Sequence, residues 1–160
     1  MLVLRSLSFS VVTLLALSGA ADASVKITGI AFVDNSVTSQ GSKAKLPPGT
    51  KIYPSGTTIT GTTGCPTDHY RTTGLIVAVI DYDGPQTAAS LQVTRSPATG
   101  GTFENAPYYI DLNAGRTLQF LGPIFDNGSY ALHLEAGFEG PSKTKLDANF
   151  KLARTCPLVQ

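Results

Sequence analysis

The densest group of reactive residue types in this chain is the segment Cys65-Pro-Thr-Asp-His-Tyr70. A cysteine close to a histidine and an aspartate is the set that a thiol nucleophile uses, but only a free thiolate reacts. We expect Cys65 to be oxidised, which leaves Asp68 and His69 in a polar loop. The chain also lacks the Gly-x-Ser-x-Gly motif of serine hydrolases. The sequence therefore predicts that the protein is not an enzyme.

Two other places hold residue types that bind metals. His133 and Glu135 stand two residues apart in an alternating segment, so both lie on one face of an expected strand, with no third ligand in view. Asp81 and Asp83, followed by Gly84, match part of a calcium loop, whose ion takes roughly six to eight oxygen ligands. The full spacing of that loop is absent, and the same residues form a turn. We predict no metal and no other cofactor, and keep Asp81 and Asp83 as a weak calcium candidate.

Tyrosines are the candidate ligand-binding residues. Tyr70, Tyr108 and Tyr109 lie in or beside expected loops, where aromatic rings form sugar-binding or protein-binding surfaces. Neighbouring residues of a strand face opposite ways, so we expect one of Tyr108 and Tyr109 to be exposed.

The N-terminus has the pattern of a secretory signal peptide. Arg5 supplies the positive charge, Leu7 to Leu17 form a short apolar run, and Ala21-Asp22-Ala23 is a small-x-small cleavage site. The run is shorter than the about 20 residues that span a bilayer. We expect residues 1–23 to be removed and the mature protein to be secreted or periplasmic, with no membrane span.

Export also bears on the two cysteines. Cys65 and Cys156 are the only ones, and an exported protein meets an oxidising compartment, so we expect them to pair. With a net charge of +1 and 14% charged residues, the chain has no field that would attract a nucleic acid.

The pattern of the rest of the mature chain predicts short strands, which would position these residues. No helical periodicity persists, and Gly-rich and Pro-rich turns separate segments of period two. The expected strands cover 24–34, about 57–62, 72–84, 87–96, 108–112, 116–121, 130–136 and 142–153. About seven or eight such strands predict a sandwich or a small barrel, with 24–160 as one all-β domain.

Three details of these strands are specific enough to be checked. Leu75 to Ile80 is apolar on both faces, as in a central strand that is covered on each side. The short connection at Pro85 to Thr87 would allow a hairpin between the flanking strands. Gly29 interrupts the first strand and predicts that it lies at a sheet edge.

One motif carries a resemblance to a known fold. The pattern Leu118-x-Phe120 followed by Asp126-x-Gly128-x-Tyr130 is similar to the passage from strand E to strand F in immunoglobulin-like domains, the tyrosine corner. The resemblance implies an antiparallel β-sandwich in which the Tyr130 hydroxyl bonds to nearby backbone. The chain departs from antibody-type domains because it has no tryptophan and its expected disulfide is elsewhere. The motif concerns fold and is silent on function.

From these observations we expect a secreted or periplasmic, non-catalytic β-sandwich with a structural or protein-interaction role. The alternative is a carbohydrate-binding module that uses the loop tyrosines. A fimbrial-type subunit, which would polymerise by strand donation, is a third reading. The sequence leaves open whether the partner is a protein or a glycan, and it indicates no role for His69 or His133.

Overall fold

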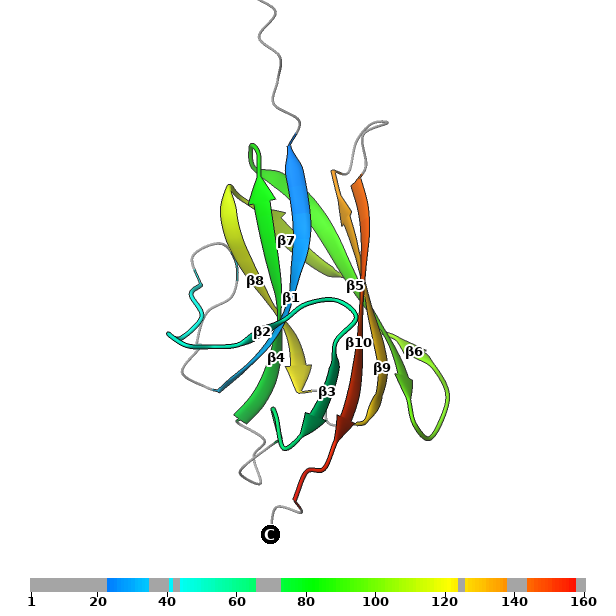
Figure 1. Cartoon of the computed structure of the whole chain (residues 1–160). Coiled ribbons are helices and arrows are strands. Elements are labelled where there is room, and N and C mark those ends of the chain that lie inside the picture. Colours follow the sequence, from blue (N-terminus) through cyan, green and yellow to red (C-terminus); the bar gives the residue numbers. More distant parts are fainter. Residues whose placement is uncertain are drawn as a thin grey trace, which may run out of the picture.

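The computed structural model describes residues 23–34, 41, 44–65, 73–123, 126–137 and 144–157. Within them the chain is all-β, and its ten strands form two sheets packed face to face (Figure 1). In chain order the strands are β1 (Ser24–Asp34), β2 (Ile52–Tyr53), β3 (Thr58–Gly61), β4 (Thr73–Asp83), β5 (Thr87–Pro97), β6 (Phe103–Glu104), β7 (Tyr108–Leu112), β8 (Gly115–Pro123), β9 (Gly128–Ala136) and β10 (Thr144–Arg154). The predicted β-sandwich is confirmed.

The first sheet has the order β2-β1-β4-β8, and the second has the order β3-β10-β9-β5-β6, with β7 also paired to β5. Eight of the ten strands match the expected ones. The two additional strands, β2 and β6, have two residues each, which is too short for alternation to reveal them. All pairs are antiparallel except β3 and β10, which run parallel.

Alternation along the strands builds the main core between the sheets. On β10, Ala148, Phe150 and Leu152 point inward and are at most 3% exposed, as predicted. On β9, Leu132 and Leu134 do the same. Together with the inward residues of β5, they pack against the inward faces of β1 and β4 in one continuous cluster.

The strand β4 is buried on both faces, which confirms the prediction for Leu75 to Ile80. Its outward residues Val77 and Val79 belong to a second, smaller apolar cluster. That cluster is closed from outside by Ala44, with Leu46 and Ile52 packed against it. The segment 44–52, which is largely polar in composition, thus covers the outer face of the first sheet through these three apolar side chains.

The expected hairpin between the strands now identified as β4 and β5 is wrong. β4 lies in the first sheet and β5 in the second, so the connection carries the chain from one layer to the other. The Tyr82 hydroxyl donates to the carbonyl of Pro85 at 2.7 Å and holds this connection. A connection of this length fits a hairpin and a crossing equally well, and alternation reports which face is buried but not which sheet a strand joins.

The position expected for the first strand also needs correction. β1 lies between β4 and the short β2, rather than at the edge of its sheet. Gly29 marks a register shift opposite Ile80 and Val79. A Cβ at Gly29 would overlap the carbonyl oxygen of Tyr53, so the glycine permits the close approach of β2.

The predicted disulfide is confirmed. Cys65 and Cys156 are bonded, with their Cα atoms 5.3 Å apart and a sequence separation of 91. They follow the ends of β3 and β10, and because these strands run parallel, both ends lie at the same end of the sandwich. The bridge therefore fastens the four-residue edge strand β3 to its neighbour.

The expected signal peptide lies outside the described residues, apart from Ala23. Within the described part of the chain, no helix is long and apolar enough to cross a membrane.

Candidate functional site

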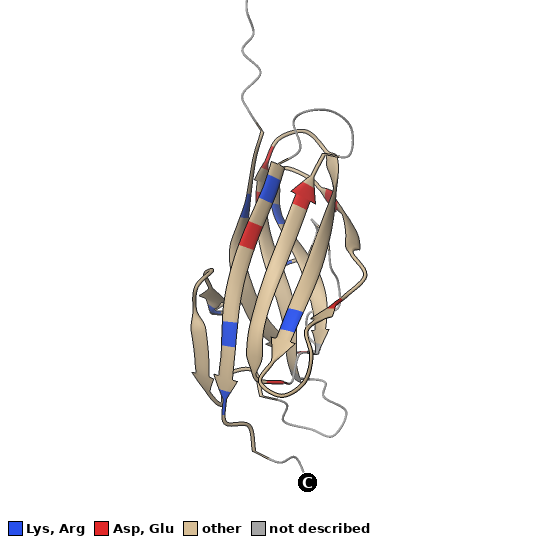
Figure 2. Ribbon diagram, turned by 90° about the vertical axis from the view of Figure 1, so that its right-hand side faces the viewer, with Lys and Arg blue, Asp and Glu red and all other residues tan. Residues whose placement is uncertain are grey.

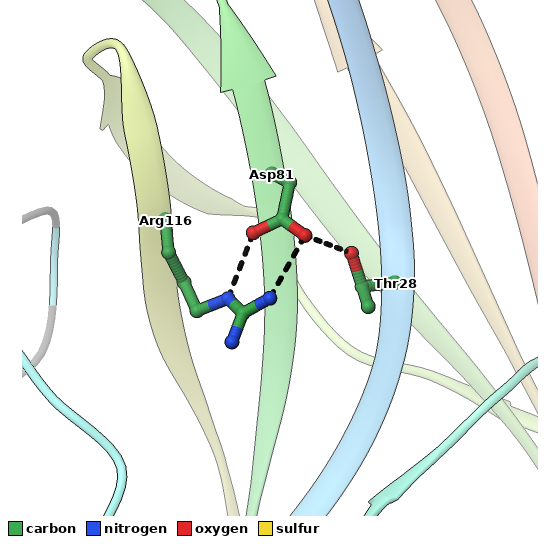
Figure 3. Close-up of polar contacts among 3 residues, drawn as sticks. All are labelled: Thr28, Asp81 and Arg116. Atoms are coloured by element: carbon green, nitrogen blue, oxygen red, sulfur yellow. Dashed lines mark hydrogen bonds and ion pairs between the residues drawn. The ribbon is translucent and has the colours of Figure 1, made fainter.

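The calcium candidate Asp81 is engaged by protein groups. Its carboxylate accepts two hydrogen bonds from the Arg116 guanidinium, at 2.8 Å from Nε and 3.0 Å from a terminal nitrogen. The Thr28 hydroxyl donates a third, at 2.6 Å. The three residues come from β4, β8 and β1, and Figure 3 shows the carboxylate held between the other two. The arrangement ties together the outer face of the first sheet.

The electrostatics of this group agree with an ion pair. The hydrogen bonds from Arg116 lower the pKa of Asp81, with Thr28 adding to the effect, and Asp81 raises the pKa of Arg116. A shallow hollow of about 430 Å³ beside them is lined by Lys26 and Asp83 as well. Among the described residues no three His, Cys, Asp or Glu side chains come together to hold a metal ion. With its oxygens on Arg116 and Thr28, Asp81 is a structural ion-pair partner.

The candidate tyrosines have different positions. Tyr108 packs against the main core, and its hydroxyl donates to the carbonyl of Leu121 at 3.4 Å, which places it between the layers. Tyr109 is 74% exposed, as expected for one member of the pair. Tyr70 lies outside the described residues, as do Asp68 and His69. Of the two tyrosines in the described residues, one therefore lies in the core and the other on the surface.

A second exposed aromatic residue accompanies Tyr109. Phe103 on β6 is 54% exposed, and these two are the exposed large hydrophobic residues of the described chain. β6 and β7 both pair with β5, so both rings stand on the same edge of the second sheet. We call the segment 103–112 the aromatic edge. The sequence analysis singled out tyrosines and did not include Phe103, and the loop-like composition of 96–107 concealed β6.

The residues of the proposed tyrosine corner lie at the end of the sandwich where β9 begins. The Tyr130 hydroxyl donates to the carbonyl oxygen of Asp126, so Asp126 acts through its backbone. Burial raises the pKa of Tyr130, and the charge of Asp126 adds to this. Gly128 is required because a Cβ there would overlap the carbonyl oxygen of Ser96 on β5.

The same end contains a buried arginine that the sequence analysis missed. Arg154, at the end of β10, is 5% exposed, and burial lowers its pKa. Its guanidinium donates to the carbonyl of Gly64 at 2.8 Å. The Asn127 side chain bonds both backbone groups of Arg154, each at 2.8 Å. Arg154 follows Leu152 in the alternating series of inward residues on β10, so this pattern could have predicted its burial. These contacts are architectural.

His133 and Glu135 lie on the outer face of the second sheet, and each contacts a different side chain of β10. The His133 ring contacts the Asp147 carboxylate, and Glu135 accepts from Lys145 at 2.8 Å. Both pairs link β9 to β10. Charges are spread along this face and do not gather in one patch (Figure 2). The pairs form part of a solvated sheet surface, and the metal-ligand geometry considered from sequence is not present in them.

The chain was compared with models of protein families, with curated proteins and with solved structures, and none of the three comparisons finds a match.

Proposed function

We propose that this chain is a non-catalytic, immunoglobulin-like β-sandwich protein of a secreted or periplasmic compartment, which binds a protein partner through the aromatic edge. The observation that carries the proposal is the joint exposure of Phe103 and Tyr109 on β6 and β7. β6 and β7 form an edge of the second sheet, and sheet edges are sites of association. Large aromatic rings in that position favour contact with another protein.

The chemistry of the edge defines the partner. Glu104 and Asp111 flank the two rings, and the segment 103–112 contains no lysine or arginine. Both carboxylates belong to exposed residues. A partner with an apolar pocket rimmed by lysine or arginine would complement this surface, because its cations would face both the carboxylates and the faces of the rings.

The geometry of the edge defines how a partner would meet it. Tyr109 is paired with Ser90, and Phe103 with Arg95, so about 17 Å separates the two positions along β5. Ser90 and Arg95 are an odd number of residues apart on one strand, so the rings stand on opposite faces of the sheet. A partner that contacts both must wrap around the edge. That extent suits an interface of roughly 800 Å² per partner.

The strand pairing supports the immunoglobulin-like part of the proposal. The pairing β1-β4-β8 corresponds to strands A, B and E, and the pairing β5-β9-β10 corresponds to strands C, F and G. Tyr130 then stands near the start of strand F, with its hydroxyl bonded upstream. The Cys65–Cys156 bridge supports an oxidising compartment, since such bonds are rare in a reducing cytosol.

Site-specific photo-crosslinking tests the proposal. A photoreactive phenylalanine analogue replaces Tyr109 or Phe103 in turn, and the protein is expressed in the cells that naturally produce it. A matched control carries the analogue at Lys26, which is exposed on β1 in the other sheet. We expect a discrete protein adduct from positions 109 and 103 and none from position 26. Equal adducts from all three positions, or none from 109, would rule out the aromatic edge as the contact.

A further inference from the structure

The turn before β9 contains a reactive dipeptide that has no role in the function proposed above. Asn127-Gly128 is the only place in the chain where a glycine follows an asparagine. At such a step the backbone nitrogen of the glycine can attack the side-chain carbonyl carbon of the asparagine, because glycine has no side chain to hinder the approach. Asn127 is exposed, so the water that completes this reaction has access to it.

The folded chain holds both reacting groups of this dipeptide in place. The Asn127 side-chain nitrogen donates to the carbonyl of Arg154 at 2.8 Å, and the side-chain oxygen accepts from the N–H of Arg154 at 2.8 Å. We call these two hydrogen bonds the Asn127 clamp. Gly128 lies in β9, opposite Leu152 of β10 and Pro97 of β5. The attacking nitrogen therefore belongs to a strand paired on both sides, and the side chain that it must attack is fixed to β10.

Arg154 connects the Asn127 clamp to the disulfide. Its guanidinium donates to the carbonyl of Gly64 at 2.8 Å, and Gly64 immediately precedes Cys65. Cys156 follows Arg154 by two residues. The bridge thus holds the end of β10 from one side, while Asn127 holds it from the other. The end of a strand opens more readily than the interior of a sheet, so loss of the bridge should loosen the Asn127 clamp.

We propose that Asn127 is a deamidation site that the Cys65–Cys156 disulfide protects. A dithiol reduces the bridge and is itself oxidised, and Asn127 then separates from Arg154. A bond forms between the Gly128 nitrogen and Cγ of Asn127, the bond from Cγ to Nδ2 breaks, and the Gly128 amide proton leaves with the ammonia. Water hydrolyses the resulting cyclic imide to aspartate or isoaspartate. The reaction uses no cofactor, and it does not involve the aromatic edge.

The modification outlasts the reduction that starts it. A carboxylate at position 127 has no N–H to donate to the Arg154 carbonyl, so re-oxidation of the cysteines restores the bridge but not the whole clamp. Isoaspartate also adds one carbon to the backbone between Asp126 and Gly128. Because the Asp126 carbonyl accepts from the Tyr130 hydroxyl, the added carbon displaces the acceptor of the tyrosine corner. A period in the reduced state therefore leaves a lasting loss of stability.

Peptide mass spectrometry after incubation in mildly alkaline buffer tests the proposal. The samples are the oxidised wild type, the Cys65→Ala/Cys156→Ala variant and a synthetic peptide of residues 122–133, with circular dichroism to verify that the proteins fold. We expect Asn127 to deamidate about tenfold or more slowly in the oxidised protein than in the peptide, because both bonds of the Asn127 clamp must open. The cysteine variant should lose most of this protection.

Two controls separate the bridge from general effects. Gly29→Ala keeps the bridge but destabilises the first sheet, so its Asn127 should deamidate within about twofold of the wild-type rate. Asn105 and Asn113 are each followed by alanine and should remain intact in every sample. Wild type that is reduced, incubated and re-oxidised should unfold at a lower urea concentration than protein that is reduced and re-oxidised at once.

Three outcomes would overturn the proposal. A rate in the oxidised wild type equal to that of the peptide would show that the Asn127 clamp does not protect, and this comparison holds even if the cysteine variant does not fold. Equal rates in the oxidised wild type and the cysteine variant would show that the bridge has no influence. Equal acceleration in Gly29→Ala and the cysteine variant would show that Asn127 responds to global stability instead of the bridge.

Discussion

Removal of the Cys65–Cys156 disulfide should strongly destabilise the protein, and the size of the effect follows from the chain length that the bridge closes. The two cysteines are 91 positions apart. In the loop-closure treatment, a cross-link over about 90 residues lowers the entropy of the unfolded chain by an amount equivalent to about 4.5 kcal/mol at 25 °C. We therefore expect the double variant Cys65→Ala/Cys156→Ala to lose about 4 kcal/mol of unfolding free energy.

Part of this loss should appear locally at β3. This strand has four residues, pairs only with β10 in the described structure, and contributes one deeply buried side chain, Ile59, which is 2% exposed. Without the bridge, the backbone amides of β3 should exchange hydrogen faster than those of β9, which is paired on both sides.

Urea denaturation followed by circular dichroism measures the global effect, and hydrogen exchange measures the local one. Wild-type protein kept in reductant serves as the control and should match the double variant within about 1 kcal/mol, because both lack the same cross-link. A loss of less than about 1 kcal/mol in the double variant would refute the reasoning. So would equal exchange rates in β3 and β9.

Three further predictions concern single residues. Tyr130→Phe removes a buried hydroxyl bonded to backbone and should lower the unfolding free energy by about 1 kcal/mol, measured by urea denaturation; an unchanged midpoint would contradict the corner. Gly29→Ala places a Cβ against the backbone of Tyr53 and should cost more than about 2 kcal/mol, read from the thermal midpoint; Gly101→Ala, at a position with open space, is the control. Because Arg116 lowers the pKa of Asp81, the stability from this pair is present above the unfolded pKa near 4 and is lost as the pH falls through the lower folded pKa. Both side chains are partly exposed, so the contribution is under about 1 kcal/mol, and Asp81→Asn should abolish this part of the pH dependence in denaturation measured between about pH 5 and pH 2.

The sequence indicated the layers of the fold well because burial leaves a direct trace in alternation. The inward residues of β10 and the double burial of β4 could both be predicted from their patterns. The pairing of Cys65 with Cys156 followed from composition and compartment. Alternation does not indicate which sheet a strand joins, however. The connection from β4 to β5, which crosses from one sheet to the other, was therefore wrongly predicted to be a hairpin. The parallel pair of β3 and β10 depends on the whole topology and leaves no local signal.

The candidate sites were less predictable because they depend on contacts between distant strands. Asp81 resembles a calcium ligand in sequence, but its partners Arg116 and Thr28 come from two other strands. Alternation predicts that one of the neighbours Tyr108 and Tyr109 faces the core and the other faces solvent. It does not predict which of the two is exposed.

Hydrogen exchange in the presence of the cross-linked partner tests the central claim, that the aromatic edge is the binding surface, most directly. The partner identified by crosslinking at position 109 is purified and mixed with the unmodified protein, and amide exchange is compared with that of the protein alone. We expect new protection in residues 103–112, with the exchange of β1 and β3 unchanged. Protection on the outer face of the first sheet or at β3, with none in 103–112, would contradict the account.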